Sequence, residues 1–282
     1  MVTGASTGIG RATAELLACQ GIPVYAGVRR PEDGQRLESE HPGLISGVEL
    51  DVTSADQIRA AVEKVGAAGE QKGLAGLVNN AGIALGGPLE FVAPDLLRRQ
   101  LEVNLIGLHS VTTAFLPLIR RGRGRIVNVG SISGLVSSPF VGPYCASKHA
   151  VEALTDALRM ELAPEGIHVA VIEPGQVRTP IWDKALAASG RMHQAIPPEG
   201  EARYEGRLRA FRYMVEKAPR HAIEPERVAR AIHHALFAAR PRTRYLLGRD
   251  ARVRYFLSRL LPDRMMDALV TRFFARMERR AQ

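Results

Sequence analysis

Short apolar runs alternate with amphipathic segments along most of this chain. Each apolar run predicts a buried strand, and the runs lie at 23–28, 47–50, 76–82, 125–131, 168–175 and 244–248. The segments between them carry apolar residues at helical spacing, at 11–21, 55–69, 95–121 and 148–166. Strands that are apolar on both faces and separated by helices indicate a parallel sheet covered on both sides. We therefore predict an α/β fold with a doubly wound parallel β-sheet.

Composition supports one globular domain with an appendage. The 282 residues are 46% hydrophobic and 24% charged. No stretch approaches the roughly 18–20 uncharged apolar residues of a membrane span, and the first residues resemble no secretory signal. Cys19 and Cys145 are the two cysteines, without metal-ligand spacing. We expect a cytoplasmic protein with reduced thiols and no metal site.

The net charge of +9 is concentrated at the C-terminus. From Arg240 onward there are twelve arginines against four acidic residues, so the preceding residues are nearly neutral. We place the main domain at 1–240 and a basic extension at 241–282. Because the charge is local and no nucleic-acid motif accompanies it, we expect no nucleic-acid partner.

The extension contains a predicted amphipathic helix capped by Asp263. Its apolar stripe lies opposite Arg272, Arg276 and Arg279 and consists of Met266, Leu269, Val270, Phe273 and Met277. Such a helix could lie on an anionic membrane surface as a peripheral contact. The alternative, which we favour, is that the stripe packs on the parent domain or on a partner subunit.

A glycine-rich turn stands at the start of the chain, in Thr3-Gly4-Ala5-Ser6-Thr7-Gly8-Ile9-Gly10, and leads into a helix. Glycines let the backbone turn sharply and approach a pyrophosphate, whose charge then meets free amides at the helix N-terminus. In doubly wound folds ligands bind at the carboxyl ends of the strands. The turn therefore predicts a dinucleotide site.

Tyr144 and Lys148 stand four residues apart at the start of a predicted helix. At this spacing the side chains share one face, where the ammonium would lower the pKa of the phenol. A tyrosine that deprotonates easily is a candidate general base. The alternative is an ordinary surface pair.

Seven marks in order resemble the short-chain dehydrogenase/reductase family between Thr3 and Thr179. They are TGASTGIG at 3–10, Asp51-Val52, NNAG at 79–82, Asn104, Ser131, YCASK at 144–148 and Pro174-Gly175. The resemblance implies a Rossmann fold and an oxidoreductase that interconverts a secondary alcohol and a carbonyl compound. The basic extension and the VYAGVRR and EVNLIG segments look like the hydroxysteroid and retinol dehydrogenase branch.

The resemblance also implies a catalytic tetrad. Tyr144 would exchange the proton, Lys148 would assist it and hold the nicotinamide ribose, and Ser131 would hydrogen-bond the reacting oxygen. Asn104 would secure a water leading toward Lys148. Taken singly, Ser131 could be a turn residue at a strand end and Asn104 a residue at a helix kink.

Cofactor preference can be predicted from the residues after the second strand. Arg29 and Arg30 stand where an acidic residue would bind the ribose of NAD, and arginine there can pair with the extra phosphate of NADP. NADP is therefore favoured over NAD, with Arg29 ahead of Arg30, unless both are solvated loop residues. By resemblance the further contacts are Gly4, Ser6, Thr7, Gly8, Ile9, Gly10, Asp51, Val52, Asn80, Ala81, Gly82, Tyr144, Lys148, Pro174, Gly175, Val177 and Thr179.

The segment at about 180–220 resembles the substrate lid of the family. It contains apolar residues that would suit a lipophilic substrate such as a steroid, retinoid or fatty-acid-like carbonyl, namely Ile181, Trp182, Leu186, Met192, Ile196, Tyr204, Phe211, Tyr213 and Met214. Core packing of the same residues is the alternative. The helices around 94–121 and 144–163 resemble those through which the family forms homodimers and homotetramers.

One departure from the family concerns the first strand, because only Met1, Val2 and Thr3 precede the glycine turn. We expect either that the natural start lies upstream or that the sheet tolerates a short strand. This feature also supports the alternative function, a catalytically idle NADP sensor or scaffold. The complete tetrad favours the enzyme.

Overall fold

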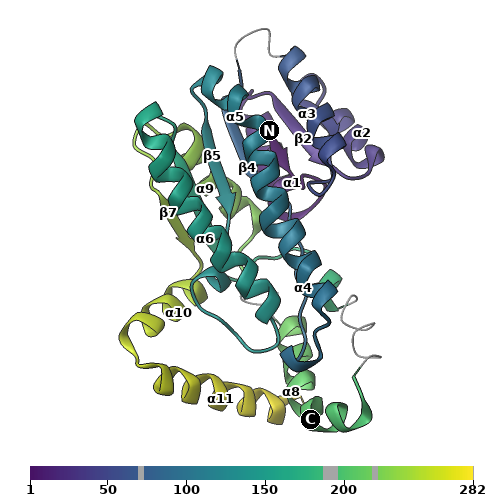
Figure 1. Cartoon of the computed structure of the whole chain (residues 1–282), viewed down its shortest axis with the longest axis vertical. Helices are drawn as coiled ribbons and strands as arrows, with labels where there is room; N and C mark the ends of the chain where they lie inside the picture. The colour runs from purple at the N-terminus through teal and green to yellow at the C-terminus, as the bar shows by residue number, and fades with distance from the viewer. Residues whose placement is uncertain (69–72, 187–195, 218–221, 282) are drawn as a thin grey trace.

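A computed structural model describes residues 1–68, 73–186, 196–217 and 222–281. Within these ranges seven parallel strands form one sheet in the order β3-β2-β1-β4-β5-β6-β7 (Figure 1). The strands are β1 (Val2–Thr3), β2 (Val24–Val28), β3 (Ile45–Glu49), β4 (Gly76–Asn79), β5 (Arg125–Val129), β6 (Val169–Pro174) and β7 (Arg244–Leu247). The prediction of a doubly wound parallel sheet is confirmed.

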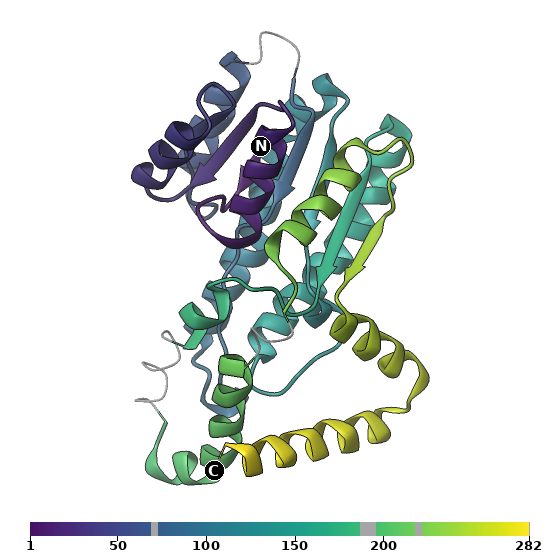
Figure 2. The same ribbon diagram turned by 180° about the vertical axis from the view of Figure 1, so that it is seen from behind.

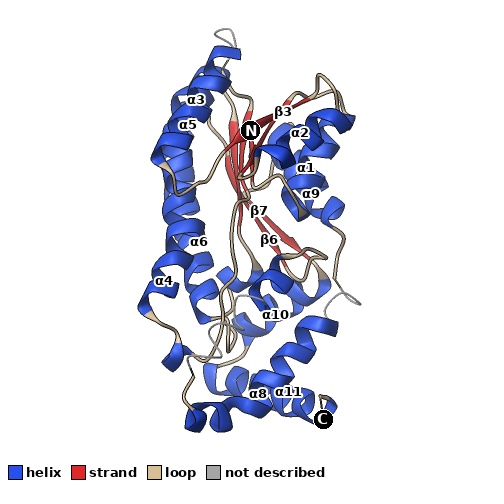
Figure 3. Ribbon diagram, turned by 90° about the vertical axis from the view of Figure 1, so that its right-hand side faces the viewer, coloured by secondary structure: helices blue, strands red, loops and turns tan. Residues whose placement is uncertain are grey.

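Helices cover both faces of this sheet (Figure 3). On one face lie α1 (Gly8–Cys19), α2 (Pro31–Glu40) and α9 (Pro225–Phe237), whose buried side chains join those of the strands in one core. On the other face lie α3 (Ala55–Ala68), α5 (Gly107–Gly122) and α6 (Gly142–Leu162). The sheet between them is apolar on both sides, which explains the continuous apolar runs of its strands.

The short first strand pairs with both of its neighbours. Val2 is in register with Ala26 of β2 and with Val78 of β4, and Thr3 is in register with Gly27. The Thr3 hydroxyl also donates to the carbonyl oxygen of Val78 at 3.3 Å. The glycine turn that follows β1 therefore lies at the centre of the sheet.

The predicted long helix at 95–121 is interrupted. It consists of α4 (Pro94–Leu101), a π-helical turn η2 (Glu102–Ile106) and α5. By length and composition alone, Pro94–Gly122 is one helical stretch in the described chain that could cross a membrane, which the sequence analysis did not expect. Here Val111, Phe115 and Ile119 of α5 are fully buried against the sheet, so it packs as a core helix.

Four helices of the described chain were not predicted, namely α2, α8 (Pro198–Lys217), α9 and α10 (Arg249–Leu260). The sequence of α2 is mostly polar and shows no clear apolar stripe. In α9 the sequence analysis overlooked a buried apolar stripe at helical spacing, made of Val228, Ala229, Ile232, Ala235 and Leu236. β7 pairs with β6 from Val171↔Arg244 to Pro174↔Leu247 and belongs to the sheet. A domain boundary at 240/241 would remove this strand, and we propose that the extension begins at Arg249.

The extension forms two helices, α10 (Arg249–Leu260) and α11 (Asp263–Arg280). α10 leaves the end of β7, and α11 runs back to α8 (Pro198–Lys217), at the end of the molecule toward which the strands point (Figure 2). Asp263 is not the helix cap, because α11 begins at Asp263 itself and Pro262 is in the capping position. The carboxylate lies instead in the first helical turn, where its negative charge interacts favourably with the positive end of the helix dipole.

The predicted stripe of α11 is divided between two environments. Met277 is buried and Val270 is half-buried in a cluster with α8, while Met266 packs against α10. Leu269 and Phe273 are exposed instead. The stripe thus packs on the parent chain in part, as favoured, and leaves a second apolar face outside.

Phe140 connects this outer layer to the loop before α6. Its φ of 66° places it in the left-handed region, and its carbonyl oxygen accepts a hydrogen bond from the Gly87 amide at 2.7 Å. Its ring packs on Phe274 of α11 and Phe211 of α8, with centroid distances of 5.6 and 6.0 Å. The contact joins the loop before α6 to the C-terminal helix α11.

Candidate active site

The backbone conformation and the close packing of the turn after β1 require glycine. Gly4 and Gly8 have φ of 64° and 59°, which side chains rarely adopt. A Cβ at Gly8 would lie 3.0 Å from Cγ2 of Thr179, and a Cβ at Gly10 would lie 2.3 Å from the carbonyl oxygen of Gly4. α1 begins at Gly8, so its first amides face the turn. The geometry fits a bound pyrophosphate.

The loop after β4 is fastened to this turn. The Asn80 side-chain amide donates to the carbonyl oxygens of Thr3 at 2.9 Å and of Gly4 at 3.1 Å. The Thr3 hydroxyl accepts from the backbone amides of Asn80 and Ala81. Asn80, predicted as a cofactor contact, therefore holds two walls of the cleft together through its side chain.

The tetrad residues come from three elements. Ser131 follows β5 and caps the short helix η3 (Ile132–Gly134), where its hydroxyl accepts from the Ser133 amide at 3.1 Å. Tyr144 and Lys148 lie on α6, with Nζ of Lys148 5.8 Å from the centre of the Tyr144 ring. Ser131 and Tyr144 also share a side-chain hydrogen bond, which lowers the pKa of the phenol. The structure thus brings Ser131, Tyr144 and Lys148 together.

Asn104 lies in the π-helical turn and fastens the site from the other side. Its side-chain oxygen accepts from the Ile83 amide at 2.9 Å, and its nitrogen donates to the Ile83 carbonyl at 2.9 Å and to Ser147 at 3.1 Å. Ser147 in turn donates to the carbonyl oxygen of Tyr144 at 2.8 Å. π-Turns are frequent at functional sites. This one joins the loop after β4 to the turn of α6 that carries the tyrosine.

The protonation of the pair differs from the expectation. Burial raises the pKa of Tyr144 to about 12, although the hydrogen bond with Ser131 acts against it. Burial lowers the pKa of Lys148 to about 8, and its Nζ donates to the Val129 carbonyl at 2.7 Å. The prediction of a phenol with a lowered pKa is wrong for this structure, because desolvation by burial outweighs the hydrogen bond from Ser131.

Apolar side chains account for that burial. The Trp182 indole meets the Tyr144 ring edge-on at 5.6 Å, and Ile181 and Phe211 pack in the same cluster. A small pocket beside them is lined by Gly86, Val141, Trp182, Ala185, Leu186 and Phe211. Of the predicted lid residues, Ile196, Tyr204, Tyr213 and Met214 pack instead against the core around Phe140. Met192 lies outside the described residues.

Arg29 and Arg30 differ in their surroundings. Both are exposed, but Arg30 forms an ion pair with Asp33 at 3.0 Å, whereas Arg29 makes no hydrogen bond or ion pair with any residue that the structure describes. Burial raises the pKa of Asp51, but hydrogen bonds from Thr53 and the charge of Arg29 lower it overall. Within the described residues Arg29 thus interacts with Asp51 through its charge alone, whereas Arg30 has a hydrogen-bonded acidic partner.

The remaining predicted cofactor residues lie around the same edge. Val52 is buried against α5, so its side chain belongs to the core. After β6, the Gly175 amide donates to the Leu247 carbonyl at 2.8 Å, and Val177 pairs with Ile223. Thr179 reaches Gly8, which brings the segment after β6 against the glycine turn.

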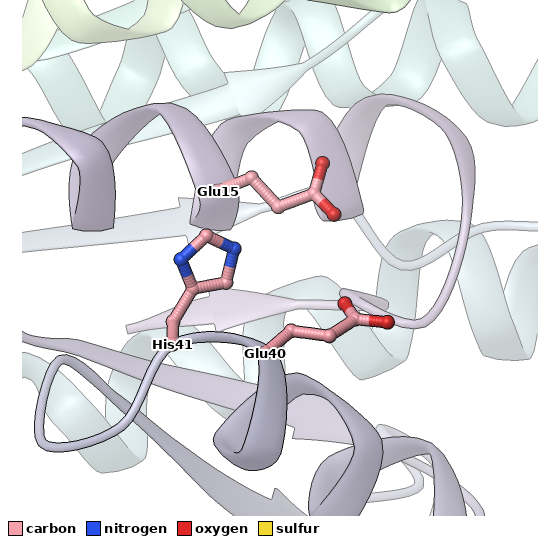
Figure 4. A group of neighbouring side chains, drawn as sticks. All are labelled: Glu15, Glu40 and His41. Carbon is pink, nitrogen blue, oxygen red and sulfur yellow. The ribbon is translucent and has the colours of Figure 1, made fainter.

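A group of ligand-type side chains lies elsewhere. Glu15, Glu40 and His41 place one ligand atom each within 4.8 Å of one another, at the junction of α1 and α2 (Figure 4). Arg11 donates to both carboxylates at 2.7 Å. We therefore interpret the group as an ion-pair network that joins the two helices.

Comparisons with known proteins agree on one family. The family model for short chain dehydrogenase matches residues 1–189. NADPH-dependent 3-dehydrocapnine reductase of Ornithobacterium rhinotracheale is 34% identical over 274 residues, covering 95% of this chain and 94% of the relative. Human retinol dehydrogenase 16 is 36% identical, covering 95% and 86%. The crystal structure of a short-chain dehydrogenase from Streptomyces avermitilis superposes with a TM-score of 0.77 at 30% identity, covering 96% and 94%.

This chain belongs to the short-chain dehydrogenase/reductase family, in a branch like that of the retinol and hydroxysteroid dehydrogenases. It is an oxidoreductase that uses a nicotinamide cofactor and acts on a small molecule.

The sequence analysis did not single out Glu152, which is buried one turn after Lys148. The sequence does contain a hint, because Glu152 is a charged residue on the helix face that carries Val151 and Thr155, which are both buried.

Proposed function

We propose that this protein is an NADP-dependent oxidoreductase that interconverts a secondary alcohol and a ketone or aldehyde. The observation that supports it most is the buried Tyr144, hydrogen-bonded to Ser131 and walled by Trp182. NADP, when bound, supplies or accepts the hydride. A phenol with a raised pKa remains protonated at neutral pH and can donate its proton to a carbonyl oxygen, which suits the reducing direction.

The tetrad residues have distinct roles in this proposal. Tyr144 transfers the proton, and Ser131 orients the reacting oxygen next to the phenol. Lys148 contributes positive charge beside the phenol and binds the nicotinamide ribose. Asn104 fixes the loop after β4 and supports the water that leads toward Lys148. Together these residues orient a polar group in a site otherwise closed by apolar side chains.

The predicted cofactor residues divide the dinucleotide among them. The turn at 3–10 would hold the pyrophosphate, and Asp51 and the backbone of Val52 would contact the adenine. The loop at 80–82 lines the cleft, and the segment from Pro174 to Thr179 meets the nicotinamide. The glycine cradle supports this arrangement, because a Cβ at Gly4 would lie 2.9 Å from Cα of Ala81.

In this proposal Arg29 determines the preference for NADPH over NADH. An experiment on Arg29 therefore tests the proposed reaction and the cofactor together. Reduction of a panel of steroid, retinoid and simple ketones is followed with NADPH and with NADH. We expect Arg29→Ala to raise the KM for NADPH by about 10–100-fold, as the loss of a charged hydrogen bond implies, and to leave NADH unaffected. Arg30→Ala is the matched control, because Arg30 is already paired with Asp33. No turnover in the panel, or equal effects in both variants, would contradict the proposal.

The substrate is lipophilic in this proposal. Trp182, Phe211 and Val141 surround the pocket next to Tyr144, and this wall offers few polar partners to a substrate. The alternative function is a catalytically idle NADP sensor or scaffold, which would bind the nucleotide without turnover. Homodimers or homotetramers would form through α4, α5 and α6.

The C-terminal extension suits a cytoplasmic protein that contacts a membrane surface. Both cysteines are free. The outer face of α10 and α11 carries exposed apolar residues among exposed arginines, namely Val253, Phe256, Leu260, Met265, Leu269 and Phe273 with Arg249, Arg252, Arg259, Arg272, Arg276, Arg279 and Arg280. Apolar and cationic side chains on one face suit an anionic lipid surface.

Vesicle sedimentation tests this contact. We expect binding to vesicles of anionic phospholipid but not to zwitterionic ones, and about tenfold weaker binding for the Phe256→Asp, Phe273→Asp double variant. Phe237→Asp is the control, because Phe237 is exposed at the end of α9, outside the extension. Equal binding to both vesicle types would exclude the electrostatic contact.

A further inference from the structure

A charged cluster lies behind the catalytic helix. Arg244 on β7 donates through Nη1 to Glu152 of α6 and to Glu173 of β6, the latter at 2.6 Å, and through Nη2 to Asp156 of α6 at 2.6 Å. Glu152 and Glu173 are buried, with exposed fractions of 7% and 2%. Three carboxylates thus share one guanidinium, although buried charges are stable only when they are paired.

Glu152 has a position built for it. Its Oε1 has no hydrogen-bond partner in the described part of the protein. A Cβ at Gly130 would lie 2.7 Å from this oxygen, and a Cβ at Gly134 would lie 3.1 Å from Cγ of Glu152. The two glycines after β5 therefore leave the space into which the carboxylate fits. An unpaired buried oxygen is costly, which favours a role beyond packing.

Lys148 lies one helical turn before Glu152 on the same face of α6. In the described part of the chain the charged groups around Glu152 are Lys148 on α6, Glu173 on β6 and Arg244 on β7. Arg244 also binds Asp156 of α6. The charge of Glu152 favours the charged form of Lys148. Arg244 is bound by all three carboxylates. Of these three acidic residues, Glu152 is the nearest to Lys148 in the sequence.

We propose that Glu152 is a positioning residue for the hydride-transfer site, whose carboxylate keeps Lys148 charged while Arg244 holds that carboxylate in place. The inference rests on the proposed function, because it assigns a role within that reaction. Glu152 touches neither substrate nor cofactor and acts only through Lys148.

The direction of the pH effect follows from the two groups. Burial, together with the charge of Glu173, raises the pKa of Glu152 to about 7. Burial lowers the pKa of Lys148 to about 8, and the charge of Glu152 acts in the opposite direction. A carboxylate there stabilises the ammonium and delays its deprotonation as the pH rises. Without it, Lys148 becomes neutral at lower pH.

The test is the pH profile of kcat/KM for carbonyl reduction with NADPH. We expect Glu152→Gln, which keeps the shape and can still accept from Arg244, to move the midpoint of the alkaline limb down by about one pH unit. Asp156→Asn is the matched control, because it removes another carboxylate from the same arginine but lies two helical turns from Lys148; its midpoint should equal that of the wild type. Thermal unfolding confirms that each variant is folded.

Glu152→Asp keeps the charge and moves it back by one methylene. We expect it to restore most of the wild-type midpoint, and it decides the question by a partial shift if Glu152→Gln does not fold. An unchanged midpoint in the Glu152 variants, or an equal shift in Asp156→Asn, would overturn the inference while leaving the proposed function intact. Absence of turnover in the wild type would overturn both.

Discussion

Replacing Tyr144 by phenylalanine is expected to lower kcat by about 10²–10⁴-fold, the usual contribution of a positioned proton donor. The ring would remain in its apolar cluster and keep its edge contact with Trp182, so only the hydroxyl is lost. The partner left behind is Ser131, whose hydroxyl also accepts from the Ser133 amide and stays satisfied. Steady-state kinetics with NADPH and a ketone substrate provide the measurement.

Nucleotide affinity separates this effect from misfolding. Titration with NADPH, followed by quenching of Trp182 fluorescence, should give a Kd in the Tyr144→Phe variant close to that of the wild type. Tyr25→Phe on β2 is the control, because Tyr25 packs against the sheet core away from the carboxyl edge. Retained turnover in Tyr144→Phe would show that another group supplies the proton.

The second large effect is expected at Gly10. A methyl group there would lie 2.3 Å from the Gly4 carbonyl oxygen and 2.4 Å from the Asn80 side-chain nitrogen, well inside contact distance. Both neighbours belong to the fastening between the glycine turn and the loop after β4. We expect Gly10→Ala to destabilise the protein by about 1–3 kcal/mol, as overpacking does, and to abolish measurable NADPH binding.

Gly66→Ala is the matched control for this substitution. Gly66 lies in α3, and a Cβ there would make an ordinary contact with Leu118 at 3.7 Å. Alanine is about 1 kcal/mol more favourable than glycine within a helix, so stability should be kept or raised. Thermal unfolding and nucleotide titration of both variants give the comparison. Equal behaviour would show that the turn can relax around a side chain.

The sequence was sufficient to predict the sheet, and its motifs pointed to residues that the structure brings together. The periodicity and the apolar runs predicted the strands. The order of the motifs predicted that Ser131, Tyr144 and Lys148 lie at one edge of the sheet. Protonation was not predictable, because the burial of Tyr144 depends on Trp182 and Phe211, which are distant in the chain. Spacing alone suggested that Lys148 would dominate.

Other features depend on contacts between elements that sequence patterns do not encode. The Arg244 cluster joins α6, β6 and β7, and no local spacing links Arg244 to Glu173. The helix α2 carries so few apolar residues that its packing rests mainly on Leu37, which is fully buried. Asp263 is a residue type that commonly caps helices, but Pro262 occupies the capping position and Asp263 is the first residue of the helix.

The left-handed Phe140 has a consequence for how substrate preference can change. Because its ring packs on both α8 and α11, the lid and the C-terminal helix share one apolar cluster just ahead of the catalytic helix. A lid transplanted from a relative would meet a foreign α11 and lose this packing. We therefore expect that exchanging α8 between relatives preserves this packing only when α11 comes from the same parent.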